Sequence, residues 1–351
     1  MRAQVSLSPC KGAEVGRVAS FASKRLKKCG AAHGAAGLRS DGQIQEAMGA
    51  DAWEDDVLRY ERFSDRRVQA PRHAPPIVLL PGFGNNSLDY LAPFGNEEAG
   101  IAAALKRRGF RVYVVPLTRK DWFKVGRSLL TRGFWSNPPT LTTHPGYSWY
   151  LERVKETVEL AQLEAGAEQV DLLGHSAGGW LGRAFLGQPQ YTAAGLSADT
   201  LGSGDLEPHP AVRSLITLGT PHTPPPPDKV KDMTGGALTW VNEMWPGAWF
   251  GPQGVKYVCV AGRAVRGNRD AQRSTVPGYS YGAYAQVCGE GHEVEGDGVV
   301  PLRSALLQGA DQTVINGVFH SMSRIRTFSE PAEVPWYGSE SVLDSWLHHL
   351  G

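Results

Sequence analysis

Long apolar runs, a strong charge imbalance and the common phosphate and metal signatures are all missing from this chain. None of the 351 residues lies in an apolar run of 18 or more, so we expect no transmembrane segment. The formal net charge is only +1, which gives no reason to expect a nucleic acid as a partner. There is no HExxH, no P-loop and no GxGxxG pattern followed by an acidic residue. We therefore expect no metal and no other cofactor.

Cysteine is scarce, with only four residues, and none of them lies in a CxxC motif or a His/Cys cluster. We therefore expect neither a zinc nor an iron–sulfur site. Cys259 lies in an apolar segment and is expected to be a buried thiol, although a disulfide with Cys288 stays open as an alternative. The acidic segment GEGHEVEGDG, residues 289–298, does not have the spacing of an EF-hand calcium loop.

Acidic residues are nearly absent from residues 1–39, where eight Lys or Arg stand against Glu14 alone. A basic segment rich in Ser and Ala is typical of an organelle transit peptide. We therefore predict a transit peptide over residues 1–39 and a chloroplast location, with the mitochondrion, the cytoplasm or an ordinary basic tail as alternatives. Residues 40–75 are polar and are expected to be a linker or an N-terminal extension.

From residue 76 onward, short apolar runs alternate with helical segments. Strands are expected at 77–84 with its turn, 110–116, 169–174, 212–219, 255–262 and 312–316. Helices are expected at 97–109, 149–166, 177–188 and 339–350. Continuous apolar strands between helices indicate an α/β fold with a mostly parallel sheet covered on both faces. Ligand sites in such sheets lie at the carboxyl ends of the strands, so we look there for functional residues.

The segment LLGHSAGGW, residues 172–180, places Ser176 directly between an expected strand and an expected helix. Gly174 and Gly178 lie two residues to either side, where a Cβ would collide across so tight a turn. This is the Gly-x-Ser-x-Gly context of a nucleophile elbow, which exposes the serine at the positive end of a helix. A helix that is simply capped by a serine would not explain the two flanking glycines.

Five blocks extend this pattern along the chain. They are PGFGNNSLDY (81–90), DLLGHSAGGWLGR (171–183), LGTPHTPPPP (218–227), GDGVVPLRSALL (296–307) and VFHS (318–321). In this order and spacing they resemble the α/β-hydrolases, and more narrowly the lipase-like, PGAP1-type serine esterases of plants and algae. The resemblance implies an α/β-hydrolase domain over residues 76–351, with an inserted lid rich in aromatic residues.

An activated serine needs a base, and the base needs an acid that orients it. The chain order in this fold is serine, acid, histidine. His320 follows the last expected strand, where the family has its base, although it could also be a surface-loop histidine. Asp297, between two glycines, is the expected acid, and Asp270 is the alternative.

Two backbone N–H groups are needed to stabilise the oxyanion of an ester-cleaving reaction. The residue after the nucleophile, Ala177, is expected to supply one of them. By the resemblance, Phe83 in the PGFG turn supplies the other. The longer HGGG form of this turn is absent.

Aromatic residues gather in two segments between the expected strands, 121–151 and 240–252. We expect lid insertions at about 119–148 and 223–254, because this fold inserts its lid at such places. The residues expected to shape the substrate pocket are Trp122, His222, Trp240, Trp245 and Trp249. The alternative is that many of these rings pack the lid onto the core. An apolar surface above a serine favours an acyl chain or another hydrophobic group, and peripheral contact with a membrane.

Together these patterns predict a serine esterase or lipase that cleaves a hydrophobic, lipid-like ester through an acyl-enzyme on Ser176. Two alternatives stay open. The same three side chains could serve an acyltransferase, in which an alcohol replaces water. The chain could also be a binding protein on a hydrolase scaffold that performs no catalysis.

Overall fold

The computed structural model describes residues 56–60, 67–130, 146–187 and 207–350. The expected transit peptide, residues 1–39, lies outside these ranges, and so do parts of the expected linker and of the first lid insertion. In the described part of the chain, no helix is long and apolar enough to cross a bilayer.

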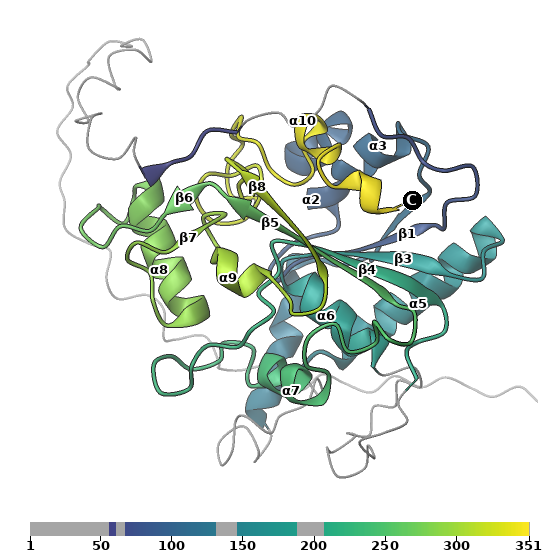
Figure 1. Ribbon diagram of the computed structural model, residues 1–351, viewed down its shortest axis with the longest axis horizontal. Helices are drawn as coiled ribbons and strands as arrows, with labels where there is room; N and C mark the ends of the chain where they lie inside the picture. The colour runs from purple at the N-terminus through teal and green to yellow at the C-terminus, as the bar shows by residue number, and fades with distance from the viewer. Residues whose placement is uncertain (1–55, 61–66, 131–145, 188–206, 351) are drawn as a thin grey trace, which may run out of the picture. The chain divides into compact units, whose positions relative to one another are not determined.

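A six-stranded sheet forms the centre of the fold (Figure 1). Its strands, in sheet order, are β2 (Val112–Val114), β1 (Ile77–Leu80), β3 (Val170–His175), β4 (Val212–Leu218), β5 (Lys256–Arg263) and β8 (Asp311–Asn316). All five neighbouring pairs are parallel, so the carboxyl ends of the strands meet at one edge. These strands lie within the six segments that the apolar runs predicted, or differ from them by one residue at an end.

Two apolar cores lie on opposite faces of this sheet. On β1, Val78 and Leu80 belong to one core, whereas Ile77 and Leu79 belong to the other. The first core is covered by α5 (Ser148–Ala165), α6 (Ala177–Leu186) and α7 (Ala237–Met244). The second is covered by α2 (Leu88–Leu91), α3 (Ile101–Lys106) and α10 (Glu340–Leu343), and Figure 1 shows the sheet between the two sets. A mostly parallel sheet covered on both faces is the α/β-hydrolase fold that the sequence predicted.

The helix α5 shows how the sequence pattern builds these layers. Leu151, Val154, Val158 and Ala161 recur at spacings of three and four, and all four are buried against the sheet. Gly166 ends the helix in a left-handed conformation with φ of 60°, which glycine adopts without strain. The helix therefore begins and ends within one residue of the predicted bounds.

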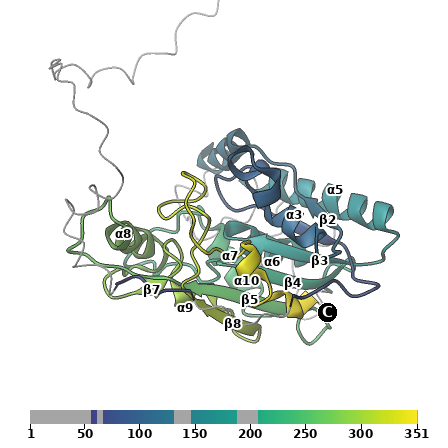
Figure 2. The same ribbon diagram turned by 90° about the horizontal axis from the view of Figure 1, so that it is seen from above.

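A smaller unit lies beside the sheet and carries the segment that leads into Asp297. It consists of α8 (Val276–Cys288) and the antiparallel pair β6 (Val265–Arg266) and β7 (Glu295–Gly296), which lie together in Figure 1. Figure 2 shows α8 and β7 side by side from above. Tyr284 on α8 connects its parts, because its hydroxyl accepts from the N–H of Gly298 at 2.8 Å and donates to the carbonyl of Val265 at 3.0 Å. The turn around Asp297 is thereby fixed from the helix side.

The remaining short elements are η2 (Pro93–Gly95), η3 (Glu97–Ala99), η4 (Arg119–Leu130), α9 (Leu302–Ala305) and η6 (Leu347–Leu350). Two helices that the sequence predicted are each interrupted. The helix expected at 97–109 is divided into η3 and α3, because Gly100 is extended and lies against the carbonyl of Leu91. The one expected at 339–350 is divided into α10 and η6. Cys259 and Cys288 are both buried free thiols.

Candidate active site

Ser176 lies in the turn between β3 and α6 with a strained backbone, at φ of 53° and ψ of −128°. Both of its peptide groups are held. Its N–H donates to the carbonyl of Leu218 at 2.9 Å, and its carbonyl accepts from the Thr220 hydroxyl at 2.7 Å. A non-glycine residue keeps such a conformation only where its surroundings fix it, so this turn is built to present the serine.

The glycines around Ser176 are required by close contacts, as their spacing predicted. A Cβ on Gly174 would lie 2.5 Å from the Cα of Gly179, and a Cβ on Gly178 would overlap the carbonyl of Leu80. On the opposite side, a Cβ on Gly82 would lie 2.7 Å from the Cβ of Ser176. The turn after β1 therefore passes directly beside the serine, and any side chain at these positions would separate the segments.

His320 and Asp297 lie together, both 1% exposed, with the imidazole Nδ1 2.7 Å from the carboxylate Oδ2. The backbone N–H of His320 also donates to the Asp297 carbonyl at 2.9 Å. Because Nδ1 donates its proton to the carboxylate, the Nε2 lone pair is free to take a proton. Among the described residues, Nε2 has no hydrogen-bond partner. This is the protonation pattern that a general base needs.

No hydrogen bond joins the Ser176 hydroxyl to His320 Nε2 in the described part of the chain. The His320 ring nonetheless packs against the residue that precedes Ser176, since its centre lies 4.8 Å from that of His175. Such contacts are often long in a ligand-free site and shorten when a substrate binds.

The other carboxylate oxygen of Asp297 is held by the backbone. Its Oδ1 accepts from the N–H groups of Val299 at 3.0 Å and Val300 at 2.7 Å. The alternative acid, Asp270, is exposed and pairs with Arg269 at 3.7 Å. Asp297, and not Asp270, is the acid that the structure brings to His320.

The two expected oxyanion donors lie on either side of Ser176, one after β1 and one at the start of α6. In the described ranges, neither the N–H of Phe83 nor that of Ala177 has an acceptor within the protein. The turn that carries Phe83 is well fixed, because the N–H of Asn85 donates to the Gly82 carbonyl at 3.1 Å. In addition, Trp122 Nε1 donates to the Asn85 carbonyl at 2.9 Å.

Of the five residues expected to shape the substrate pocket, Trp122 is the one that adjoins the site. It is 5% exposed and its ring centre lies 5.0 Å from that of Phe83, which is 58% exposed. Trp122 therefore packs against the exposed Phe83 ring, in the turn whose Gly82 lies against Ser176.

The segment after β4 is hydrogen-bonded to α6. This corrects the expectation that His222, Trp240 and Trp245 line the substrate pocket. Arg183 donates to the carbonyls of His222 at 3.2 Å and Trp245 at 2.6 Å, and burial lowers its pKa to about 10. His222 is fully buried, with Nε2 3.0 Å from the hydroxyl of Thr217. Trp240 and Trp245 are buried and pack edge to face at 5.2 Å. These rings fill the core because their segment packs on α6, so they form no surface for a substrate.

Trp249 was also predicted to line the substrate pocket, and it lies elsewhere. It lines a cavity together with Lys256 and Asp311, the first residues of β5 and β8. That is the amino edge of the sheet, opposite to the edge that carries Ser176. Aromatic content alone does not reveal which edge of a sheet a connecting segment follows.

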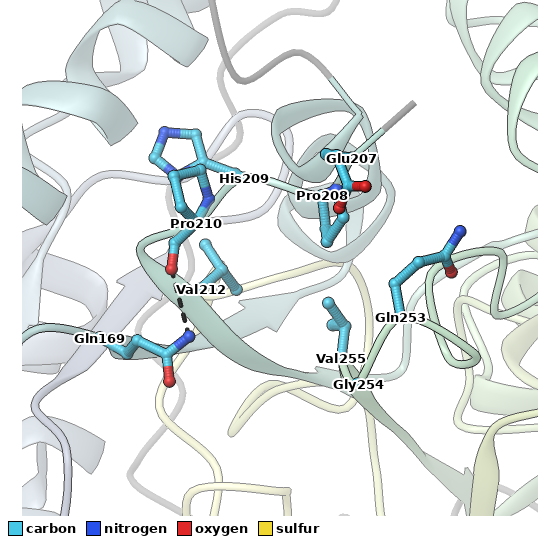
Figure 3. A pocket seen from close by; sticks show the side chains of 9 residues that line it. All are labelled: Gln169, Glu207, Pro208, His209, Pro210, Val212, Gln253, Gly254 and Val255. Atoms are coloured by element: carbon cyan, nitrogen blue, oxygen red, sulfur yellow. Dashed lines mark hydrogen bonds between the residues drawn. The ribbon is translucent and has the colours of Figure 1, made fainter. Parts of the chain in front are cut away.

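Another cavity, of about 580 Å³, lies at the same amino edge (Figure 3). Val212 and Val255, where β4 begins and just before β5, line it together with His209. Gln169 closes one side and donates from Nε2 to the Pro210 carbonyl at 3.1 Å. Its place at the start of the strands separates this cavity from Ser176, so it offers no path to the candidate site.

Comparison with protein-family models finds no match, and comparison with curated protein sequences finds none either. Similar solved structures include lipases and a carboxyl esterase. A mature lipase of Bacillus licheniformis is 14% identical over 81% of this chain and 96% of its own, with a TM-score of 0.43. A metagenomic carboxyl esterase is 12% identical over 88% of each chain, with a TM-score of 0.46. EstA of Clostridium botulinum is 13% identical over 89% of this chain and 94% of its own, with a TM-score of 0.40. At these values the functional argument depends on the geometry of this chain, and the PGAP1-type resemblance stays a prediction.

Proposed function

We propose that the protein is a serine esterase that cleaves hydrophobic carboxylic esters through an acyl-enzyme on Ser176. The observations that carry this proposal are the His320–Asp297 pair, whose Nε2 has no partner among the described residues, and its ring contact with His175, which directly precedes a serine held in a strained turn. A serine that only caps a helix does not need such strain, and among the buried histidines that the structure describes His320 is the one that pairs with a buried carboxylate.

In the proposed mechanism, the Ser176 hydroxyl attacks the ester carbonyl carbon while His320 Nε2 takes the hydroxyl proton. The carbonyl oxygen becomes an anion, and the N–H groups of Phe83 and Ala177 donate to it. The tetrahedral intermediate collapses, and His320 returns the proton to the departing alcohol. Water then attacks the acyl-enzyme, with His320 again as the base, and the carboxylic acid leaves. Asp297 stays ionised throughout and keeps Nε2 as the reactive nitrogen.

Exposed apolar side chains at the same edge of the sheet support a hydrophobic substrate. Phe83 and Leu88 lie in the turn and the short helix directly after β1, and both are more than half exposed. The neighbouring Gly82 lies against Ser176, and the exposed Phe123 follows Trp122, whose ring contacts Phe83. An apolar rim of this kind suits an acyl chain, and it also suits peripheral contact with a lipid surface.

The test is hydrolysis of a panel of p-nitrophenyl esters of increasing acyl length, together with phospholipid and triacylglycerol substrates. Wild type should release carboxylic acid, and Ser176→Ala should lose at least about 10³-fold in kcat while its circular dichroism spectrum is unchanged. Equal hydrolysis by the variant would refute the proposal. Product analysis with an added acceptor alcohol distinguishes hydrolysis from acyl transfer.

A chloroplast location is proposed on the composition of residues 1–39 alone. The test is a fusion of these residues to a fluorescent protein in plant or algal cells. Fluorescence in the plastid supports the proposal, whereas fluorescence in the mitochondrion or the cytoplasm overturns it.

A further inference from the structure

Tyr90 and His175 are buried next to the site, at 0% and 1% exposure, and their polar side-chain atoms are occupied by hydrogen bonds within the protein. The Tyr90 hydroxyl lies 2.9 Å from the N–H of Gly82, 2.8 Å from Asn85 Nδ2 and 2.8 Å from His175 Nδ1. Gly82 and Asn85 are donors and occupy both lone pairs of the hydroxyl oxygen. The hydroxyl proton is therefore donated to His175 Nδ1.

This contact fixes the tautomer of His175. Because Nδ1 accepts, the ring proton is on Nε2, which lies 2.8 Å from the carbonyl of His320 and donates to it. Burial, and then the neighbouring His320, lower the pKa of His175 well below 6.5, while burial raises the pKa of Tyr90 above its usual value. Both groups therefore stay neutral near pH 7, and the hydrogen bonds keep one direction.

The hydrogen-bond chain joins the three segments that carry the proposed chemistry. Gly82 directly precedes Phe83, the proposed oxyanion donor, and His175 directly precedes Ser176. His320 is the proposed base, and the chain ends on its carbonyl. A misplacement of about 1 Å in such a site can cost about 10²-fold in rate, so the spacing of these segments matters for catalysis.

We propose that Tyr90 and His175 are positioning residues, which hold the oxyanion turn and the His320 loop in register with Ser176. This inference rests on the proposed esterase function. It differs from a purely structural role, in which the buried hydroxyl contributes to the stability of the fold and the rate of the chemical step does not depend on it.

The test compares Tyr90→Phe with Tyr147→Phe on a soluble p-nitrophenyl ester. Tyr147 is a matched control because it is 2% exposed, packs on Trp180 and makes one hydrogen bond, to the Thr234 carbonyl at 3.3 Å. Tyr90→Phe should lower kcat by about 10- to 100-fold and change KM by less than about twofold. Tyr147→Phe should keep kcat within about twofold of wild type, even if it lowers the Tm by as much as Tyr90→Phe does. Equal kcat in the two variants would overturn the proposal.

A second measurement needs no substitution and tests the hydrogen-bond chain on which the positioning role depends, even if Tyr90→Phe does not fold. Nitrogen NMR of histidine-labelled wild type at neutral pH should show His175 as the Nε2–H tautomer and His320 as the Nδ1–H tautomer. A charged His175, or one protonated on Nδ1, contradicts the hydrogen-bond chain. If wild type cleaves no ester, the esterase proposal fails and this spectrum still tests the chain. If Tyr90→Phe is as active as wild type, only the positioning role fails.

Discussion

The hydroxyl of Tyr337 lies 2.8 Å from Asp297 Oδ2, the same oxygen that accepts the proton of the proposed base. The hydroxyl also accepts from the N–H of Gly262 at 2.8 Å, so its own proton is directed at the carboxylate. Burial, followed by the charge of Asp297, raises the pKa of Tyr337 well above 10, which keeps it a donor. The acid is therefore held by a side chain as well as by backbone N–H groups.

Replacing Tyr337 by Phe should weaken both the site and the fold. The charged acceptor loses one donor, which costs about 1.5–3 kcal/mol of unfolding free energy. We expect kcat/KM to fall by about 10-fold, because Asp297 is less well oriented. Tyr60→Phe is the control, since its hydroxyl donates to the Ser341 carbonyl on the surface. Ester hydrolysis and urea unfolding measure both effects, and wild-type values for Tyr337→Phe would refute this role.

Two glycine substitutions should change stability in opposite directions. Gly178→Ala places a Cβ against the Leu80 carbonyl and should destabilise the protein by about 1–3 kcal/mol, with loss of activity. Gly282→Ala lies inside α8, where a Cβ meets nothing within 4 Å. It should stabilise the helix by about 0.5–1 kcal/mol. Urea unfolding measures both changes, and a neutral Gly178→Ala would show that α6 does not need its close approach to β1.

Stability should decrease as the pH falls below about 6.5. Burial lowers the pKa values of His175 and His222 well below 6.5. The unfolded chain therefore takes up protons that the folded chain does not, and each imidazole costs about 1.4 kcal/mol per pH unit. Unfolding in urea at about pH 7.5 and about pH 5.5 measures the loss. His222→Gln should remove about half of this slope, and an unchanged slope would contradict the burial of His222 as a neutral ring.

The sheet was predictable because its strands are covered on both faces and therefore need unbroken apolar runs. Residues 77–80 and 257–261 are of this kind, and local composition identifies them without knowledge of the fold. The helix α8 was missed, since its sequence VPGYSYGAYAQVC has two glycines, a proline and no apolar stripe. Its stability comes from contacts such as Tyr284 with Val265 and Gly298, which exist only in the folded chain.

The sequence placed Ser176, Asp297 and His320 because each lies in a short motif after a strand. Tyr90 ends the block PGFGNNSLDY and Tyr337 lies in none of the five blocks, and the sequence assigned neither a role because their importance arises from tertiary contacts with His175 and Asp297. Similarly, aromatic content did not distinguish rings that fill the core from rings at the site. Trp245 packs on the helix that follows Ser176, within reach of the Arg183 guanidinium. Tertiary contacts, and not local composition, decide whether such a ring lies at the site or in the core.

The most direct measurement of the central claim is mass spectrometry of the protein after reaction with a fluorophosphonate, which phosphonylates an activated serine. Wild type should gain a single adduct, and peptide mapping should locate it on Ser176. His320→Ala should react at least about 10²-fold more slowly, because the serine loses its base. An unmodified Ser176 in a preparation that still cleaves esters, or equal labelling of His320→Ala, would contradict the account.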